Sequence, residues 1–188
     1  MRTESQALVD LDDLSLIDLA SGGDLEAFDV LVARFGPRLH GYARRMLSDE
    51  CAVQEVVQDS FVAAWRGLGT FRRDSSVQTW MFAICSRKIT DAYRKRSPLP
   101  IGDDIDDHTA TSTLGLPFPS VSGEAFVDAL EASLAVLPPR QRAAWLLREV
   151  EGMAYQEIGE VLALGAGAAR GQYTRARGAL RESLRSWQ

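Results

Sequence analysis

Basic and aromatic residues are interleaved over residues 71–96 of this 188-residue chain. The basic members are Arg72, Arg73, Arg87, Lys88, Arg94, Lys95 and Arg96, and the aromatic members are Phe71, Trp80, Phe82 and Tyr93. Cationic side chains bind phosphates, and flat rings offer stacking faces to unpaired bases. This combination indicates contact with nucleic acid, although the chain as a whole carries a net charge of −5.

The charge is sorted into blocks along the chain. Residues 34–96 carry 12 basic and six acidic side chains, net +6, and residues 138–188 carry eight basic and five acidic ones, net +3. Residues 1–33 and 97–137 each have a net charge of −7. This asymmetry favours nucleic-acid contact through two parts of the chain. Nineteen of the 21 bases are Arg, which suits forked contacts to phosphate or base edges; a general bias toward Arg is the alternative.

A helix-turn-helix candidate lies between Tyr155 and the end of the chain, with its turn at Leu164 and Gly165. The second helix is expected to bury a stripe formed by Ala169, Tyr173, Ala176, Leu180, Leu184 and Trp187. Its arginines fall off that stripe, which fits a helix that enters a DNA major groove. The alternative is an ordinary amphipathic helix whose arginines are only solvated.

The elements that position these groups are predicted to be helices. Apolar residues recur every three or four positions through most of the chain, and no useful alternating pattern appears. We expect Gly36 and Pro37 to interrupt one helix, and Ser75 or Ser76 to cap another. Residues 97–122 contain four Pro, two Gly, four Asp and no base, which is typical of a linker. The predicted fold is all-α, with two small helical domains (14–96 and 123–188) joined by a flexible acidic linker (97–122).

Several function classes find no support in the sequence. Cys51 and Cys85 are far apart, so two reduced thiols are expected and neither a disulfide nor a metal site. His40 and His108 are the two histidines, and no nucleophile elbow, phosphate loop or metal spacing is present. No signal peptide or membrane-spanning run is found. We therefore expect no enzyme, catalytic residue, cofactor, small-molecule substrate or membrane insertion, and a cytoplasmic location.

Four segments in order resemble the extracytoplasmic-function (ECF) group of bacterial sigma-70 factors. VVQDSFVAAW and TFRRDSSVQTW resemble parts of region 2, and LPPRQR and EGMAYQEIGEVL resemble parts of region 4. The resemblance covers nearly everything after about Leu14. It implies a subunit that directs core RNA polymerase to promoters and assists DNA opening, with no chemistry of its own.

The resemblance also implies which residues bind the polymerase. In the family, the helix carrying Gln54, Glu55, Gln58 and Asp59 docks on the clamp helices of the β′ subunit, and the β subunit is a further partner. These polar side chains face away from the apolar residues of the same helix, so they are available to a partner. A solvated face would fit the composition equally well.

The promoter contacts implied by region 2 lie on the loop after Gly69 and on the following helix. This segment opens the minus-ten element, where a base is flipped out and held in a pocket. The implied contacts are Arg72, Arg73, Ser75, Ser76, Arg87, Lys88, Arg94 and Lys95. Ser75 and Ser76 are equally explained as helix caps, and Trp80 is expected in the hydrophobic core. Many family members carry Asn where this chain has Arg87.

Region 4 implies a recognition helix for the minus-thirty-five element, with contacts from Ala168, Arg170, Gln172, Arg175 and Arg177. The run GAGA lacks a Ser or Thr cap, and each Gly costs about 1 kcal/mol relative to Ala inside a helix. Gln172 is a candidate for reading adenine through a bidentate hydrogen bond. We expect this helix to bind phosphates more than it reads bases.

Two further expectations concern the chain's surroundings. The acidic linker, with Asp103, Asp104, Asp106 and Asp107, is expected either to mimic nucleic-acid charge in the RNA exit path or to act as a spacer. An anti-sigma factor is an expected partner, and nucleoid association is expected when the protein is active. The competing hypothesis is a stand-alone helix-turn-helix regulator of duplex DNA, which would need no strand-opening block at residues 34–96.

Overall fold

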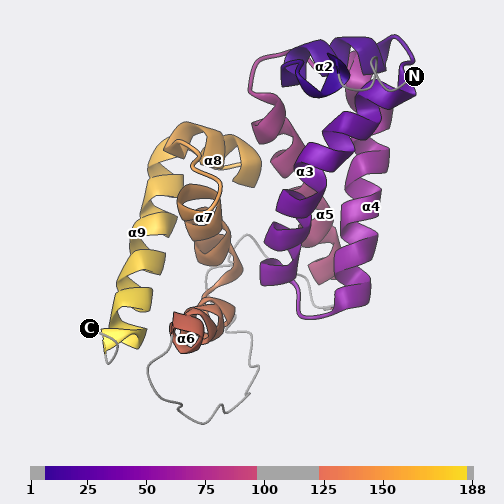
Figure 1. Cartoon of the computed structure of the whole chain (residues 1–188). Coiled ribbons are helices and arrows are strands. Elements are labelled where there is room, and N and C mark those ends of the chain that lie inside the picture. The colour runs from indigo at the N-terminus through magenta and orange to yellow at the C-terminus, as the bar shows by residue number, and fades with distance from the viewer. Residues whose placement is uncertain (1–6, 97–122, 186–188) are drawn as a thin grey trace. The chain divides into compact units, whose positions relative to one another are not determined.

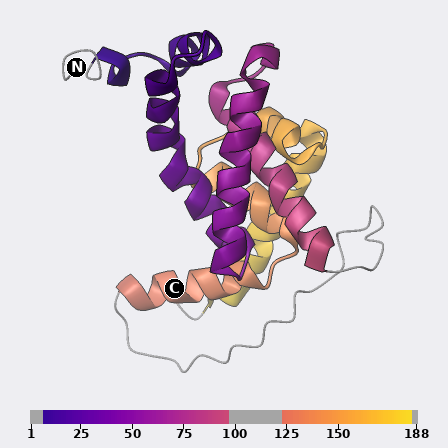
Figure 2. The same ribbon diagram turned by 90° about the vertical axis from the view of Figure 1, so that its right-hand side faces the viewer.

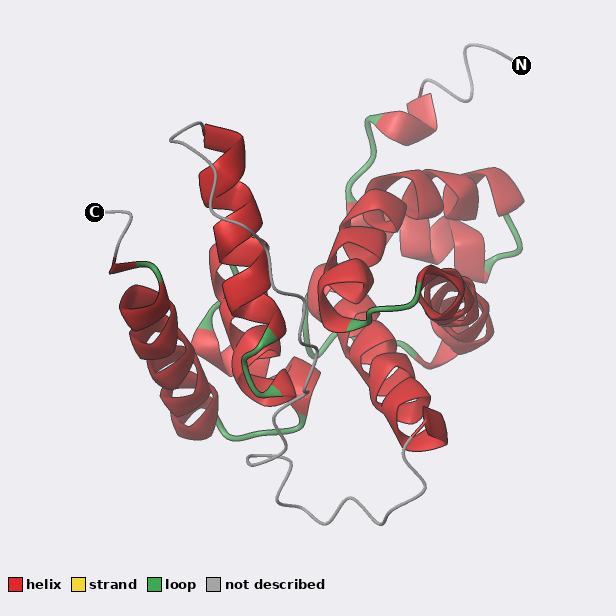
Figure 3. Ribbon diagram, turned by 90° about the horizontal axis from the view of Figure 1, so that it is seen from below, coloured by secondary structure: helices red, strands yellow, loops and turns green. Residues whose placement is uncertain are grey.

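The computed structural model of this chain describes residues 7–96 and 123–185. Within those ranges every regular element is a helix, as Figure 3 shows. The chain divides into two compact units, Met1–Arg96 and Ser97–Gln188. The predicted all-α fold is therefore confirmed. The expected linker at 97–122 lies outside the described residues.

The first unit is built from α2 (Asp13–Ser21), α3 (Leu25–Met46), α4 (Glu50–Gly67), the short 3-10 helix η1 (Leu68–Thr70) and α5 (Val77–Arg96). Helices α3, α4 and α5 run side by side in alternating directions, and α2 lies across one end of them (Figures 1 and 2). Asp12, Asp24 and Asp49 cap the starts of α2, α3 and α4, each accepting a hydrogen bond from a backbone amide of the first turn.

The core of the first unit is a set of apolar stripes that face one another. Helix α3 buries Leu31, Phe35 and Leu39, and α5, which packs on α3, buries Met81 and Phe82. Each fully buried side chain of this size contributes roughly 1.5–3 kcal/mol relative to its exposed state. The opposite faces of α4 and α5 therefore remain for polar residues, and these faces carry the candidate site.

Helix α3 continues through Gly36 and Pro37, so the predicted interruption is wrong. Proline removes one backbone hydrogen bond and is costly inside a helix. The side chain of Pro37 is exposed, while the buried stripe of α3 continues without a shift from Phe35 to Leu39 and Tyr42. Burial of that continuous stripe outweighs the local cost.

The second unit is built from α6 (Gly123–Ala135), α7 (Pro139–Glu149), α8 (Tyr155–Leu162) and α9 (Ala166–Ser183). Pro139 takes the first position of α7, so the proline pair opens this helix. Arg142 is buried and donates hydrogen bonds from Nη2 to the carbonyls of Ala135 and Leu137, at 2.5 and 3.1 Å. These bonds join the end of α6 to α7, and they satisfy carbonyls that a helix end leaves open.

Candidate polymerase-binding and DNA-binding surfaces

Helix α4 presents a polar face to solvent. Gln54, Glu55, Gln58 and Asp59 are all exposed. The opposite face of the helix buries Val53, Val56, Ser60 and Ala64. Because the two faces are separated by the 3.6-residue period, burial of the apolar side holds the polar side outward. All four residues expected to bind polymerase thus share an accessible face.

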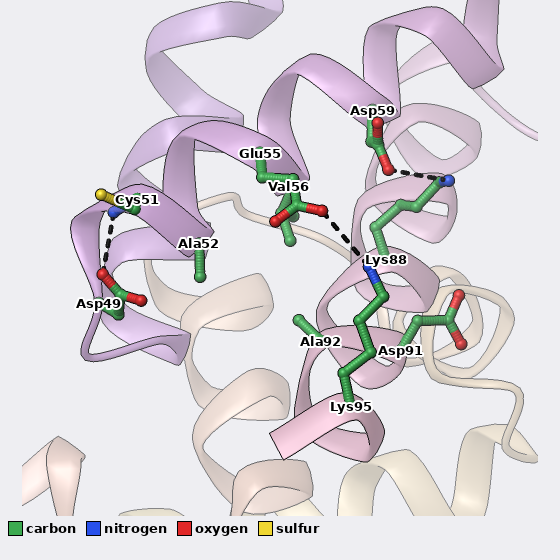
Figure 4. A pocket seen from close by; sticks show the side chains of 10 residues that line it. All are labelled: Asp49, Cys51, Ala52, Glu55, Val56, Asp59, Lys88, Asp91, Ala92 and Lys95. Atoms are coloured by element: carbon green, nitrogen blue, oxygen red, sulfur yellow. Dashed lines mark hydrogen bonds and ion pairs between the residues drawn. The ribbon is translucent and has the colours of Figure 1, made fainter.

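Two acids on this face are paired with lysines of α5, across a hollow between the two helices (Figure 4). Lys88 Nζ lies 3.4 Å from Asp59 Oδ2, and Lys95 Nζ lies 3.3 Å from Glu55 Oε1. The two acids expected to bind polymerase and the two lysines expected to bind DNA are therefore neighbours. Pairs this exposed are individually weak and screened by salt, so a stronger partner of either member can replace them.

The loop between η1 and α5 carries the first two candidate DNA contacts. Arg72 is exposed and its Nε lies 3.1 Å from Oδ2 of Asp74, within the same loop. Arg73 has a positive φ of 61° and its guanidinium contacts Asp18 of α2. Phe71 packs on Trp80, with ring centroids 4.9 Å apart, which anchors the start of the loop to α5. The loop is thus tied to the bundle by an aromatic contact and by an ion pair.

Ser76 is the residue that caps α5. The amide of Thr79 donates to Ser76 Oγ at 3.1 Å, and the two hydroxyls lie 2.8 Å apart. This geometry supports the capping alternative for Ser76, since its oxygen already serves the helix terminus. Ser75 is half-buried beside it.

The remaining candidate bases on α5 face solvent. Arg87 donates from Nε to the carbonyl of Ala83 at 3.2 Å, and Arg94 Nη1 lies 3.8 Å from Asp91 Oδ1. Both arginines are exposed, so their charge is available to phosphates. Trp80 was expected in the hydrophobic core, but it is only partly buried, with its ring against Phe71.

In the second unit, α8 and α9 form a tight helix-turn-helix. Helix α8 ends at Leu162, and the C-cap residue Ala163 takes the left-handed conformation with φ of 53°. A Cβ on the buried Gly159 would lie 2.6 Å from the carbonyl oxygen of Leu164, so glycine permits the close approach of the turn. Gly165 caps α9 without a side-chain hydrogen bond, as expected for the GAGA run.

The outer face of α9 carries four of the five residues expected to contact the minus-thirty-five element. Ala168, Arg170, Arg175 and Arg177 are all exposed. Gln172, however, is only 4% exposed and lies on the buried stripe with Ala169, Ala176 and Leu180. The predicted reading of adenine by Gln172 is therefore wrong, because a buried amide cannot reach a base edge. Tyr173, which was expected on that stripe, lies at its border.

Tyr173 links α9 to α7. Its hydroxyl donates to Glu149 Oε1 at 2.5 Å, and its ring lies 5.7 Å from that of Tyr155. The hydrogen bond to Glu149 raises the pKa of Tyr173 above its ordinary value, because it stabilises the protonated hydroxyl. The bond therefore joins α9 to the end of α7 while the hydroxyl is protonated.

Sequence reasoning missed Asp18, the partner of Arg73, and the structural role of Arg142. Asp18 contacts a residue 55 positions later in the chain, and Arg142 binds backbone carbonyls. Neither kind of contact leaves a local sequence pattern. The one available signal for Asp18 was its place at an exposed position of an acidic helix. Among the described residues, no cluster of His, Cys, Asp or Glu could hold a metal ion, and no helix is long and apolar enough to cross a membrane.

Each of the two units matches a known family model. Residues 31–98 match the model of sigma-70 region 2, and residues 128–180 match the model of sigma-70 region 4. The chain belongs to the sigma-70 family. The first match covers most of α3 and all of α4, η1, the loop and α5, and the second covers α7, α8 and most of α9. Both candidate surfaces therefore lie inside the matched regions.

Curated relatives of this sigma factor match over most of their length. An RNA polymerase sigma-H factor of Pseudomonas aeruginosa is 29% identical over 181 residues, which cover 92% of this chain and 93% of the relative. An ECF RNA polymerase sigma-E factor of Escherichia coli K12 is 28% identical over 178 residues, covering 90% and 93%. The assignment to the ECF group, made from four sequence segments, is confirmed.

Two solved structures are similar to this sigma factor. CnrH, solved with the cytosolic domain of CnrY, is 30% identical with a TM-score of 0.69, covering 93% of this chain and 97% of that chain. RpoE of Bartonella quintana, solved with the anti-sigma factor NepR, shares the fold at 22% identity and a TM-score of 0.66, covering 86% and 98%. The protein is thus a sigma factor for promoter-specific transcription, a class of initiation factor and not of enzyme. The stand-alone regulator is not favoured.

Proposed function

We propose that this sigma factor binds core RNA polymerase through the exposed face of α4, with Gln54, Glu55, Gln58 and Asp59 against the β′ clamp helices. The observation that carries the function is the presence of sigma regions 2 and 4, in that order, on one chain. The polar face of α4 supports the docking site, because its side chains point outward while the helix itself is fixed by its buried stripe.

The proposed promoter contacts use both basic surfaces. Arg72, Arg87 and Arg94 bind phosphates of the opened minus-ten strand, and Lys88 and Lys95 join them once α4 is engaged by polymerase. Arg170, Arg175 and Arg177, with Ala168 beside them, face the minus-thirty-five duplex. The exposure of the six arginines supports this arrangement, because their charge is open to phosphate oxygens. Direct base reading by α9 is left to Ala168 and the arginines.

The proposed partners include an anti-sigma factor. RpoE was solved with the anti-sigma factor NepR, and CnrH, the relative at 30% identity, was solved with the cytosolic domain of CnrY. Such a partner would compete with polymerase for the same helices. We place the protein in the cytoplasm and, when bound to polymerase, at the nucleoid.

The test is transcription in vitro with core polymerase over a promoter library, with and without this protein. We expect a defined set of start sites to appear only when the protein is present. Replacement of Gln54 and Gln58 by Ala leaves both α4–α5 ion pairs intact and should weaken the affinity for core polymerase about tenfold, or ~1.4 kcal/mol.

The matched control replaces two exposed polar residues of α3, Glu26 and Asp29, by Ala, and should leave the affinity for core polymerase unchanged. Failure of the wild-type protein to redirect initiation would refute the function. Equal affinities for the α4 variant and the control would refute the docking face alone.

A further inference from the structure

Arg73 adopts a backbone conformation that is unusual for its residue type. Its φ of 61° lies in the left-handed region, which a long side chain seldom occupies. It sits in the loop between η1 and α5, two residues after Phe71, whose ring is fixed on Trp80. A residue held in this region requires surrounding contacts that over-determine its position.

Asp18 supplies such a contact from a distant part of the chain. It lies on α2, and its Oδ1 accepts a hydrogen bond from Nη2 of Arg73, 55 residues later. Helix α2 is itself fixed by the burial of Leu16 and Ile17 and by its packing on η1. The carboxylate is therefore presented from a rigid element to a loop that has no regular structure of its own.

The neighbouring arginine behaves differently. Arg72 pairs only locally, with Asp74 of the same loop, and its side chain is 85% exposed. The side chain of Arg73 is 54% exposed and is directed to α2. Of two adjacent cations, one is presented to solvent and the other ties the loop to the first helix.

We propose that Asp18 is a positioning residue for the strand-opening loop, residues 71–76. In this proposal the ion pair between Arg73 and Asp18, here called the latch, fixes the loop, and Arg73 does not contact phosphate. The latch keeps the backbone of residues 71–76 in the conformation that presents Arg72 to the DNA phosphates. This inference rests on the proposed function of the loop, and it revises the expectation that both arginines bind the displaced strand. The opposite reading makes Asp18 a mask that competes with phosphate for Arg73.

The latch and the mask predict effects of opposite sign. If the pair is a latch, Asp18→Asn loosens the loop and slows promoter opening by holoenzyme, about twofold to fivefold, as suits an exposed pair. If Asp18 is a mask, the same substitution frees a cation and speeds opening or tightens binding of a single-stranded minus-ten oligonucleotide. Asp29→Asn, the same change at an exposed acid of α3, is the matched control.

A charge swap separates the latch from direct DNA contact by Arg73. Arg73→Asp alone should slow opening, and the double variant Asp18→Arg with Arg73→Asp should restore opening to within about twofold of wild type. Aspartate tolerates the left-handed region better than arginine, so the swap adds no backbone strain. An acid at position 73 cannot bind phosphate. A swap no better than Arg73→Asp alone would therefore overturn the proposal.

The free protein provides a measurement that does not depend on polymerase. Hydrogen exchange of the backbone amides in residues 71–76 should speed up in Asp18→Asn, return to the wild-type rate in the swap, and stay unchanged in Asp29→Asn. Unchanged exchange in Asp18→Asn would overturn the latch, whatever the transcription result. A wild-type protein that opens no promoter but shows the expected exchange pattern would refute the proposed function and leave the latch standing.

Discussion

The two cysteines occupy contrasting environments at the scale of single residues. Cys51 is exposed at the start of α4, whereas Cys85 is buried on α5. Burial raises the pKa of the Cys85 thiol to about 12, since a thiolate would lose its hydration there, and the hydrogen bond with Ser60 only partly offsets this effect. Of the two thiols, only that of Cys51 is accessible to a reagent in solvent.

This contrast predicts the outcome of thiol labelling. One thiol per chain should react quickly with a maleimide at about pH 7.5 in the native protein. Both thiols should react in about 6 M guanidinium, which lies above the unfolding midpoints of ordinary proteins. Mass spectrometry of peptides should place the native label on Cys51. A Cys51→Ser variant with no native labelling is the control, and rapid native labelling of Cys85 would show that the α4–α5 core opens readily.

At the scale of elements, the helix-turn-helix depends on how closely α8 approaches the turn that leads to α9. Gly159 of α8 lets the chain pass close to its own turn, while Gly167 lies near the start of α9 with open space around it. The first glycine is required by packing. The second only lowers the helical propensity of α9.

The same substitution at these two glycines should have opposite effects on the free energy of unfolding. Gly159→Ala should destabilise the second unit by about 1–3 kcal/mol, because the new Cβ meets backbone that must move. Gly167→Ala should stabilise it by about 1 kcal/mol. Urea unfolding of the full chain, followed by circular dichroism, measures both. A loss of stability in Gly167→Ala would mean that the start of α9 is shaped by contacts other than those seen.

The whole molecule consists of two units, each with its own hydrophobic core. Phe35 and Phe82 anchor the first, and Leu147 and Ile158 lie in the second. Each unit carries one of the two proposed DNA-binding surfaces, and the two surfaces share no residue. Separate cores also allow the units to unfold as separate cooperative blocks.

We expect calorimetry of the full chain to require two transitions, with a calorimetric enthalpy larger than the van't Hoff enthalpy of a single two-state fit. Gly159→Ala should lower the midpoint of one transition and leave the other within the error of the wild-type value. A single transition that shifts as a whole in this variant would show that the two units fold as one.

The sequence was sufficient for those features that depend on local periodicity and composition. Apolar residues at intervals of three and four placed the helices, and charge blocks separated the two basic modules from the acidic segments. Motif order was specific enough to identify the family. The outward face of α4 followed from the same period, because Val53 and Val56 must be buried if the helix is to pack.

Local sequence patterns could not identify the buried face of a helix made largely of small residues. In α9 the glycines and alanines give no strong apolar contrast, so the stripe was assigned through Tyr173 when Gln172 is the buried residue. The break expected at Pro37 failed for a related reason. The cost of one proline is local, whereas the gain from an unbroken stripe is summed over the whole of α3.

Composition and periodicity by themselves determined that this chain forms helices and has two basic parts, and the resemblance of its ordered motifs to sigma factors indicated a promoter-binding role. Tertiary structure alone decided which charges meet: Asp18 with Arg73, Asp59 with Lys88, and Glu55 with Lys95. The physical reason is that helical period sets the side on which a residue lies, while only the packing of separate elements sets which residue stands opposite it.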